Sequence, residues 1–159
     1  MDRGFTFASG EILSYLATEC HISESFDPSH GVPEYPRTRF AAQWDTGATK
    51  SVITQRVVDA CGLKPIRSGY TQGVHGVQKT EAYVVNLYLP DKVVFYELTV
   101  IKVKATDVWW DVLIGMDIIT TGDFAITNKG GVTMFSFRYP SKTHIDFHNK
   151  DEAYSTSTA

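Results

Sequence analysis

Apolar residues occur along most of the chain in short runs, several with the alternation of one residue in and one residue out that is typical of β-strands. Such runs predict strands over 11–24, 38–44, 80–89, 93–103 and 109–114. In 11–24 apolar residues fall on both parities, so a helix is the second interpretation of that segment. The pattern as a whole predicts a mainly β protein.

Turn-forming residues divide these runs into hairpins. Gly73-Val74-His75-Gly76 is placed at the tip of a hairpin within 69–90, and Asn128-Lys129-Gly130-Gly131 joins two later strands. Glycine suits such tips because it adopts positive φ without steric cost. We therefore expect two antiparallel hairpins, the first with a mobile tip.

Two short helices are predicted between the strands. Thr54 is placed to cap a helix that Gly62 ends in the left-handed conformation, and residues 116–122 suit a single turn closed by Gly122. The turn-rich stretch 27–36 is expected to be a loop.

The length of 159 residues and the 43% hydrophobic content suit one domain with a proper core. We divide the chain into an N-terminal extension over 1–9, a folded domain over 10–140 and a polar, poorly ordered tail over 141–159.

Charge and apolar runs narrow the possible partners. The chain has 15 Lys and Arg against 18 Asp and Glu, without a basic cluster that would follow a phosphate backbone, so we expect no nucleic acid partner. The first residues lack a signal peptide's apolar stretch, and no run is long enough to cross a bilayer. The expected location is the cytoplasm, without a membrane partner.

Cys20 and Cys61 are the two cysteines of the chain, and we expect both to be reduced and structural. Metal binding by Cys20, His21 and Cys61 is the alternative. It is disfavoured because the spacing matches no zinc pattern and no fourth ligand is evident. We predict neither a metal nor a cofactor.

The first candidate for chemistry is Asp45-Thr46-Gly47-Ala48, where a carboxylate stands on a glycine-containing turn directly after an apolar strand. An ordinary surface turn is the plain explanation of this motif. A second motif, Val112-Leu113-Ile114-Gly115, follows about 70 residues later and precedes a helical turn.

Together the two motifs resemble the retropepsin family of aspartic peptidases. The order of strand, Asp-Thr-Gly-Ala, glycine-bearing hairpin, further strands, apolar-apolar-Gly and helix matches over about 10–140. Gly115-Met116-Asp117-Ile118 and Gly122-Asp123-Phe124 are most similar to bacterial retropepsin-like proteins.

This resemblance implies a fold and a reaction. The fold is a closed acid-protease half-barrel with one or two short helices, paired in a two-fold homodimer. The reaction is peptide-bond hydrolysis by a water held between Asp45 and the Asp45 of a second copy, because two carboxylates in contact share a proton and the chain has one Asp-Thr-Gly. The expected partners are a second copy and a peptide or protein substrate.

Roles carry over to matching positions. Asp45 is the catalytic candidate, and the residues implied to support it are Thr46, Gly47 and Ala48. The implied flap that binds substrate comprises Gly73, Val74, His75, Gly76 and Val77. The second motif comprises Leu113, Ile114 and Gly115. For His75 itself, a solvated hairpin-tip histidine is the simpler explanation, so it is left out of catalysis.

The sequence also departs from the family. Retroviral enzymes carry an Asp and an Arg that brace the dimer where this chain has Thr49 and Met116, so the dimer interface is open. Asp117 and Asp123 are alternative partners for Asp45, but a first-turn position in a helix explains Asp117 and a turn explains Asp123.

Two alternatives remain. The missing bracing pair and the bulky Trp44 before Asp45 allow a dimeric retropepsin-fold module that binds extended peptides without cleaving them. The other alternative is a chain that is a monomer in isolation and becomes active only within a larger assembly or after processing.

Overall fold

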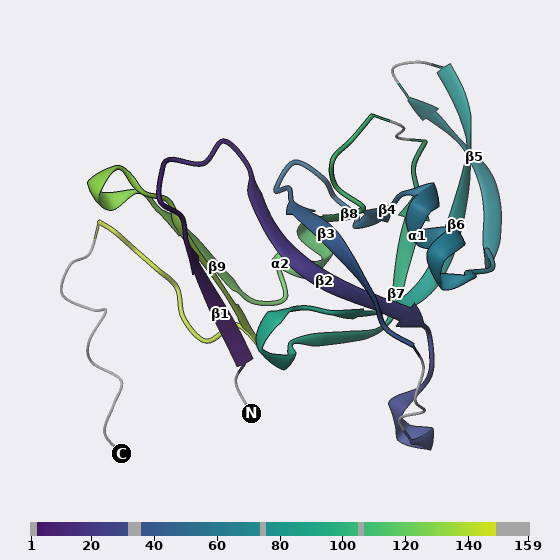
Figure 1. Ribbon diagram of the computed structural model, residues 1–159, viewed down its shortest axis with the longest axis horizontal. Helices are drawn as coiled ribbons and strands as arrows, with labels where there is room; N and C mark the ends of the chain where they lie inside the picture. Colours follow the sequence, from purple (N-terminus) through teal and green to yellow (C-terminus); the bar gives the residue numbers. More distant parts are fainter. Residues whose placement is uncertain (1–2, 32–35, 74–75, 105–106, 149–159) are drawn as a thin grey trace.

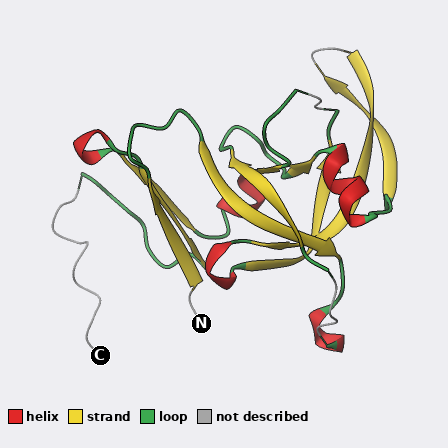
Figure 2. Cartoon of the chain, in the orientation of Figure 1, coloured by secondary structure: helices red, strands yellow, loops and turns green. Residues whose placement is uncertain are grey.

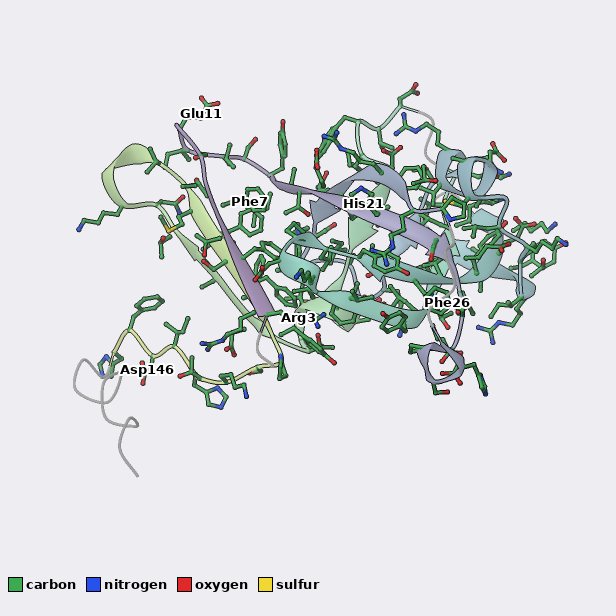
Figure 3. The ribbon with its side chains drawn as sticks, turned by 60° about the horizontal axis from the view of Figure 1, so that its bottom comes forward. Arg3, Phe7, Glu11, His21, Phe26 and Asp146 are labelled. Carbon is green, nitrogen blue, oxygen red and sulfur yellow. The ribbon has the colours of Figure 1, made fainter. Side chains whose placement is uncertain are left out.

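The computed structural model describes residues 3–31, 36–73, 76–104 and 107–148 of the chain. Strands make up nearly half of these residues, with two short α-helices and three 3-10 turns between them (Figure 2). The strands are β1 Arg3–Ala8, β2 Leu16–Glu24, β3 Thr38–Trp44, β4 Val52–Ile53, β5 Arg67–Gly73, β6 Gly76–Tyr88, β7 Val94–Lys102, β8 Val112–Ile114, β9 Asp123–Thr127 and β10 Met134–Tyr139. The helical elements are η1 Pro28–His30, α1 Gln55–Cys61, η2 Pro90–Lys92, α2 Met116–Ile119 and η3 Lys129–Gly131.

The larger sheet closes on itself. Its strand order is β2-β3-β8-β4-β7-β6-β5, and β2 also pairs with β6, so that every strand but β5 belongs to a ring. The pairing of β2 with β6 is antiparallel and matches His21 through Glu24 with Tyr88 through Val85. Closure leaves fewer free strand edges. The expected mainly β half-barrel with one or two short helices is confirmed, with two α-helices among the described residues. The expected two-fold homodimer stays a prediction.

A smaller antiparallel sheet has the order β1-β10-β9 and lies beside the barrel (Figure 1). Strand β1 pairs with β10 along its whole length, from Arg3 with Tyr139 to Ala8 with Met134. The division of the chain at residues 9 and 140 stays a prediction. The strand before residue 10 is nevertheless paired with the last strand of the predicted domain.

An aromatic cluster joins the two sheets. Trp44 at the end of β3 stacks on Phe124 with ring centroids 5.6 Å apart and lies 5.0 Å from Phe137. Phe5 and Phe135 complete the cluster with centroids 5.9 and 6.1 Å from that of Trp44. Burial of several aromatic side chains is a large hydrophobic contribution, so the smaller sheet is part of the structure that supports the end of β3.

The predicted elements match the observed ones closely. The segment 11–24 contains a strand, β2, and the helical alternative is wrong. Gly62 ends α1 with φ of 63°, in the left-handed conformation, as predicted. Thr54 precedes α1 as its N-cap, but its side chain makes no capping hydrogen bond. Its buried hydroxyl has no hydrogen-bond partner within the described residues.

Cys20 is 1% exposed, and Cys61 is half-buried. Burial, with smaller contributions from Asp111 and Cys61, raises the pKa of the Cys20 thiol to about 12. A thiol with so high a pKa is protonated and unreactive at neutral pH, which suits a structural residue.

Of the described residues, none belongs to a helix that is both long and apolar enough to cross a bilayer.

Candidate functional site

The two sequence motifs meet because β8 lies between β3 and β4. Strand β8 runs parallel to β3, pairing Trp44 with Ile114, and antiparallel to β4, pairing Val52 with Leu113. The chain leaves β3 at Asp45, turns, and returns as β4 on the other side of β8. Asp45 and Gly115 therefore follow neighbouring, parallel strand ends at one edge of the sheet.

The turn at Asp45 is fixed by main-chain hydrogen bonds. The Asp45 amide donates to the carbonyl oxygen of Ile114 at 2.9 Å, and the Ala48 amide donates to the carbonyl oxygen of Asp45 at 3.2 Å. The Gly47 amide donates to Oδ1 of Asp45 at 2.8 Å, which fixes the half-buried carboxylate. Its Oδ2 has no partner in the described part of the chain.

Thr46 and Gly47 are exposed and Ala48 is half-buried, so the predicted supporting residues all border the carboxylate rather than the core. A Cβ at position 47 would lie 3.1 Å from Oδ1 of Asp45, which is tighter than normal packing. Glycine therefore lets the turn fold against its own carboxylate.

Gly115 is required by its neighbours rather than by its backbone angles. A Cβ at this position would lie 2.7 Å from the carbonyl carbon of Lys50, 2.8 Å from its oxygen and 2.9 Å from the carbonyl oxygen of Ala48. These are backbone atoms that cannot rotate away. Glycine in the second motif is thus what allows the Asp45 turn to lie against β8.

Ser51 and Asp117 form a part-buried polar link between the two motifs, and their contact was not predicted from the sequence. The Asp117 carboxylate accepts the Ser51 hydroxyl at 2.7 Å and the Ser51 amide at 3.0 Å. The Ser51 hydroxyl oxygen in turn accepts the Gly115 amide at 3.0 Å. Asp117 thus has a structural role, as predicted, although it acts through Ser51. The available signal for this contact in the sequence was a serine directly before an apolar strand.

The positions of the retroviral bracing pair are occupied by Thr49, which is exposed, and Met116, which is half-buried. Here the main chain joins the two segments, because the Met116 amide donates to the carbonyl oxygen of Ala48 at 2.8 Å. The bond needs no charged side chain, so replacing the pair leaves the turn anchored.

Asp123 lies apart from the Asp45 turn and begins β9, so the prediction of a turn at this residue was wrong. It pairs with Arg138 and accepts the Ser141 hydroxyl at 2.6 Å. Burial alone would raise the pKa of Asp123, but hydrogen bonds from Ser141, Arg138 and the Lys142 and Thr143 amides outweigh it and lower that pKa. Asp123 fixes the chain after β10.

Trp44 is 5% exposed and lies in the aromatic cluster, and its Nε1 donates to the hydroxyl of Thr18 at 3.1 Å. Side chains alternate along a strand, so the residue before Asp45 points to the opposite side of the sheet. The indole therefore leaves the surroundings of the Asp45 carboxylate open.

A cleft of about 700 Å³ lies between the Asp45 turn and the hairpin formed by β5 and β6. The turn provides one wall, the hairpin strands provide the other, and β4 and the end of β7 form the floor. The lining residues are Gly47, Ala48, Thr49, Lys50, Val52, Arg67, Gly69, Tyr70, Thr80, Glu81, Ala82, Ile101 and Val103.

The hairpin confirms the predicted strand arrangement around residues 73–77. Strands β5 and β6 are antiparallel and paired as far as Gly73 with Gly76, and Val77 pairs with Gln72. Val74 and His75, predicted at the flap tip, lie outside the described residues. In Figure 1 the two strands extend away from the barrel on the side where β4 and α1 lie.

Glu81 is the acidic residue of the cleft lining, and it was not among the predicted site residues. Its carboxylate accepts Lys102 Nζ at 2.5 Å, Lys79 Nζ at 3.2 Å and the Tyr83 hydroxyl at 3.1 Å. The hydrogen bond from Lys102, then those from Lys79 and Tyr83, lower the pKa of Glu81 to about 2. Desolvation and then the Glu81 contact raise the pKa of Tyr83 to about 12.

The fold is that of the retropepsin-like aspartic proteases. A family model described as aspartyl protease matches residues 37–118, which is more than half of the chain and includes both motifs. The chain belongs to this aspartyl protease family. No curated protein sequence matches it.

Three solved structures are similar to this chain, and the first of them shows the same fold. A retropepsin-like aspartic protease from Rickettsia conorii is 10% identical, with a TM-score of 0.53 over 87% of this chain and 94% of that one. The simian foamy virus protease is 18% identical with a TM-score of 0.43 over 66% and 92%. The retroviral protease-like domain of Ddi1 from Leishmania major is 20% identical, with a TM-score of 0.45 over 72% and 82%.

Proposed function

We propose that the protein is an aspartic endopeptidase that works as a homodimer, with Asp45 of each copy forming the catalytic pair. The observation that carries the proposal is the Asp45 carboxylate itself. It is half-buried at a strand end, and Oδ1 is fixed by the Gly47 amide while Oδ2 has no partner within the described residues. One oxygen thus orients the group, and the other is available for chemistry.

In this mechanism a water lies between the two Asp45 carboxylates, which share one proton. The ionised Asp45 takes a proton from the water as its oxygen attacks the peptide carbonyl carbon, and the protonated one gives its proton to the carbonyl oxygen. The tetrahedral intermediate then collapses to a carboxylic acid and an amine. The amine receives the proton first taken from water, and one hydroxyl proton of the intermediate returns to the other Asp45, which restores the shared proton. No covalent bond to the protein forms.

The second copy is needed because the described residues place no other carboxylate on Asp45. Asp117 is bound to Ser51, and Asp123 is bound to Arg138. A two-fold axis between two copies would bring the exposed Asp45 turns together, with Thr46 beside the axis. Main-chain bracing of the turn through Met116 and Ala48 supports an interface that needs no Asp and Arg pair.

The cleft supports a peptide as the substrate. The hairpin of β5 and β6 would act as a flap that covers an extended peptide and excludes water, with residues 73–77 at its tip. The cleft wall built from Gly47 and Ala48 allows a substrate backbone to approach the carboxylate closely.

Cleavage of an unfolded protein across pH 4 to 8 tests the proposal, comparing the unaltered protein with Asp45→Asn. We expect Asp45→Asn to reduce the rate by at least about a thousandfold, since the dyad supplies both the base and the acid. Asp59→Asn, an exposed aspartate on α1, is the matched control and should keep its activity. Equal rates for the unaltered protein and Asp45→Asn would refute the assignment.

Mixing tests whether the site is shared between copies. If each site needs two Asp45 residues, adding excess Asp45→Asn protein should lower the activity of the unaltered protein as mixed dimers form. A fourfold excess leaves about 4% of the dimers with two Asp45 residues by random pairing. Activity that stays proportional to the amount of unaltered chain would contradict a shared site.

A peptide-binding protein without activity is the competing outcome. It predicts a dimer that binds extended peptides in the cleft and cleaves none of them at any pH from 4 to 8. Sedimentation of the same sample separates this from a monomer that has not assembled a site.

A further inference from the structure

The cleft beside the Asp45 turn has an excess of positive charge that its one acidic lining residue does not neutralise. Lys50 belongs to the turn and Arg67 to β5, and both are exposed and line the cleft. Neither makes an ion pair or a side-chain hydrogen bond within the part of the chain that the structure describes. Two free cations thus face one groove.

Glu81 is engaged elsewhere. Its two oxygens bind Lys102, Lys79 and the hydroxyl of Tyr83, so one carboxylate is already shared by two ammonium groups. Lys102 also pairs with Glu81 across β6 and β7 in the sheet register. The two lining cations Lys50 and Arg67, together with Lys79 and Lys102 that bind Glu81, thus carry four positive charges against the one negative charge of Glu81.

The walls between these charges are apolar. Val52, Ala82, Ile101 and Val103 line the same cleft, which holds about 700 Å³. The methylene groups of a glutamate or aspartate side chain fit against such walls, while its carboxylate reaches a cation at the mouth. The planar guanidinium of Arg67 suits a carboxylate because it donates two parallel hydrogen bonds.

We propose that this cleft selects peptides with an acidic side chain at the position that lies against Lys50 and Arg67. Two-fold symmetry repeats the cleft, so the preference applies on both sides of the cleaved bond. The inference rests on the proposed function, because it assigns a substrate class to the same site.

Two matched assays keep the preference separate from the activity. Peptides that differ only in Asp, Asn or Lys flanking the central bond are measured for binding to Asp45→Asn protein and for cleavage by the unaltered protein. We expect the Asp peptide to bind about tenfold more tightly than the Asn peptide and the Lys peptide more weakly still, with the difference shrinking at high salt.

Charge reversal assigns the preference to its residues. Lys50→Glu with Arg67→Glu should reverse the order so that the Lys peptide binds best. Lys129→Glu is the control, because Lys129 lies in η3, on the opposite side of Figure 1 from β5. This reversal should leave the order unchanged. The neutral variants Lys50→Gln and Arg67→Gln serve where a reversal prevents folding, and each should reduce the preference.

The outcomes distinguish the two proposals. If the Asp and Asn peptides are bound and cleaved equally, the acidic preference is overturned and the proposed peptidase activity is unaffected. The same holds if Lys129→Glu changes the order of the peptides as much as the reversals at Lys50 and Arg67 do. Tight, selective binding of the Asp peptide without cleavage overturns the peptidase and supports the preference. Binding and cleavage of none of the peptides overturns both.

Discussion

The carboxylate of Asp117 accepts both the amide and the hydroxyl of Ser51, and so joins α2 to the segment that follows the Asp45 turn. Ser51 is fully buried, and its hydroxyl oxygen also accepts the Gly115 amide. One serine therefore connects three segments: the turn, the end of β8 and α2.

Removing that hydroxyl should destabilise the protein. In Ser51→Ala the Gly115 amide loses its acceptor and Asp117 loses its shortest hydrogen bond, and unmet buried groups cost about 1–3 kcal/mol. Urea unfolding measures the difference. Ser14→Ala, at an exposed serine, is the control and should change the free energy of unfolding by less than about 0.5 kcal/mol.

Adding one methyl group at Gly115 should disrupt the turn. Gly115→Ala places a Cβ within 2.9 Å of backbone atoms of Lys50 and Ala48, and relief of that overlap must move the Asp45 turn away from β8. We expect a loss of about 1–3 kcal/mol in stability together with loss of cleavage. Gly10→Ala meets no atom within 4 Å and should have neither effect. An active, fully stable Gly115→Ala protein would contradict this account of the turn.

Loss of Trp44 from the aromatic cluster should destabilise the protein more than loss of an exposed tryptophan. Trp44→Ala removes an indole that is 5% exposed and in contact with four phenylalanines, at a cost of about 3–5 kcal/mol. Trp109 is 47% exposed, so Trp109→Ala should cost about 1 kcal/mol or less. Thermal or urea unfolding compares the two. Similar losses would mean that the cluster contributes little beyond surface contact.

Stability should depend on Glu81 in acid. The Lys102, Lys79 and Tyr83 contacts lower its pKa from 4.5 to about 2 in the folded protein, so folding favours the ionised form. Its stabilising effect is complete above the ordinary value of 4.5 and is lost as the pH falls from there to about 2. The stability difference between the unaltered protein and Glu81→Gln should therefore be steady above about pH 5 and shrink below it.

Urea midpoints measured across this range provide the test, with Glu11→Gln as the control at an exposed glutamate outside any described ion pair. A difference that grows as the pH falls would mean that the ionised Glu81 destabilises the fold.

Local patterns predicted the elements well because strands and turns depend on nearby residues. The predicted strand 38–44 is β3, and Gly62 ends α1 through its own backbone angle. The inward position of Trp44 was also available from the alternation of Phe40, Ala42 and Trp44, all buried. Strand β1 was missed, although Phe5 and Phe7 alternate with small or polar residues in it.

Contacts between distant segments were harder to predict. The meeting of Asp45 and Gly115 followed from the resemblance of two motifs, since periodicity says nothing about which strands pair. The link between Ser51 and Asp117 and the charges around Lys50 and Arg67 depend on the three-dimensional arrangement of four or more segments. No spacing in the sequence reports such an arrangement.

The position of β8 between β3 and β4 also sets an order of assembly. During synthesis β2 and β3 can pair as soon as residue 44 has emerged. The other neighbour of β3 is β8, which cannot pair with it until residues 112–114 have been made. Until then the Asp45 amide lacks its acceptor on Ile114, and β4 lacks one of its two neighbours. Such long-range closure is slow compared with hairpin formation. A nascent chain of this protein therefore carries Asp45 in an unfinished turn until residue 114 has been made.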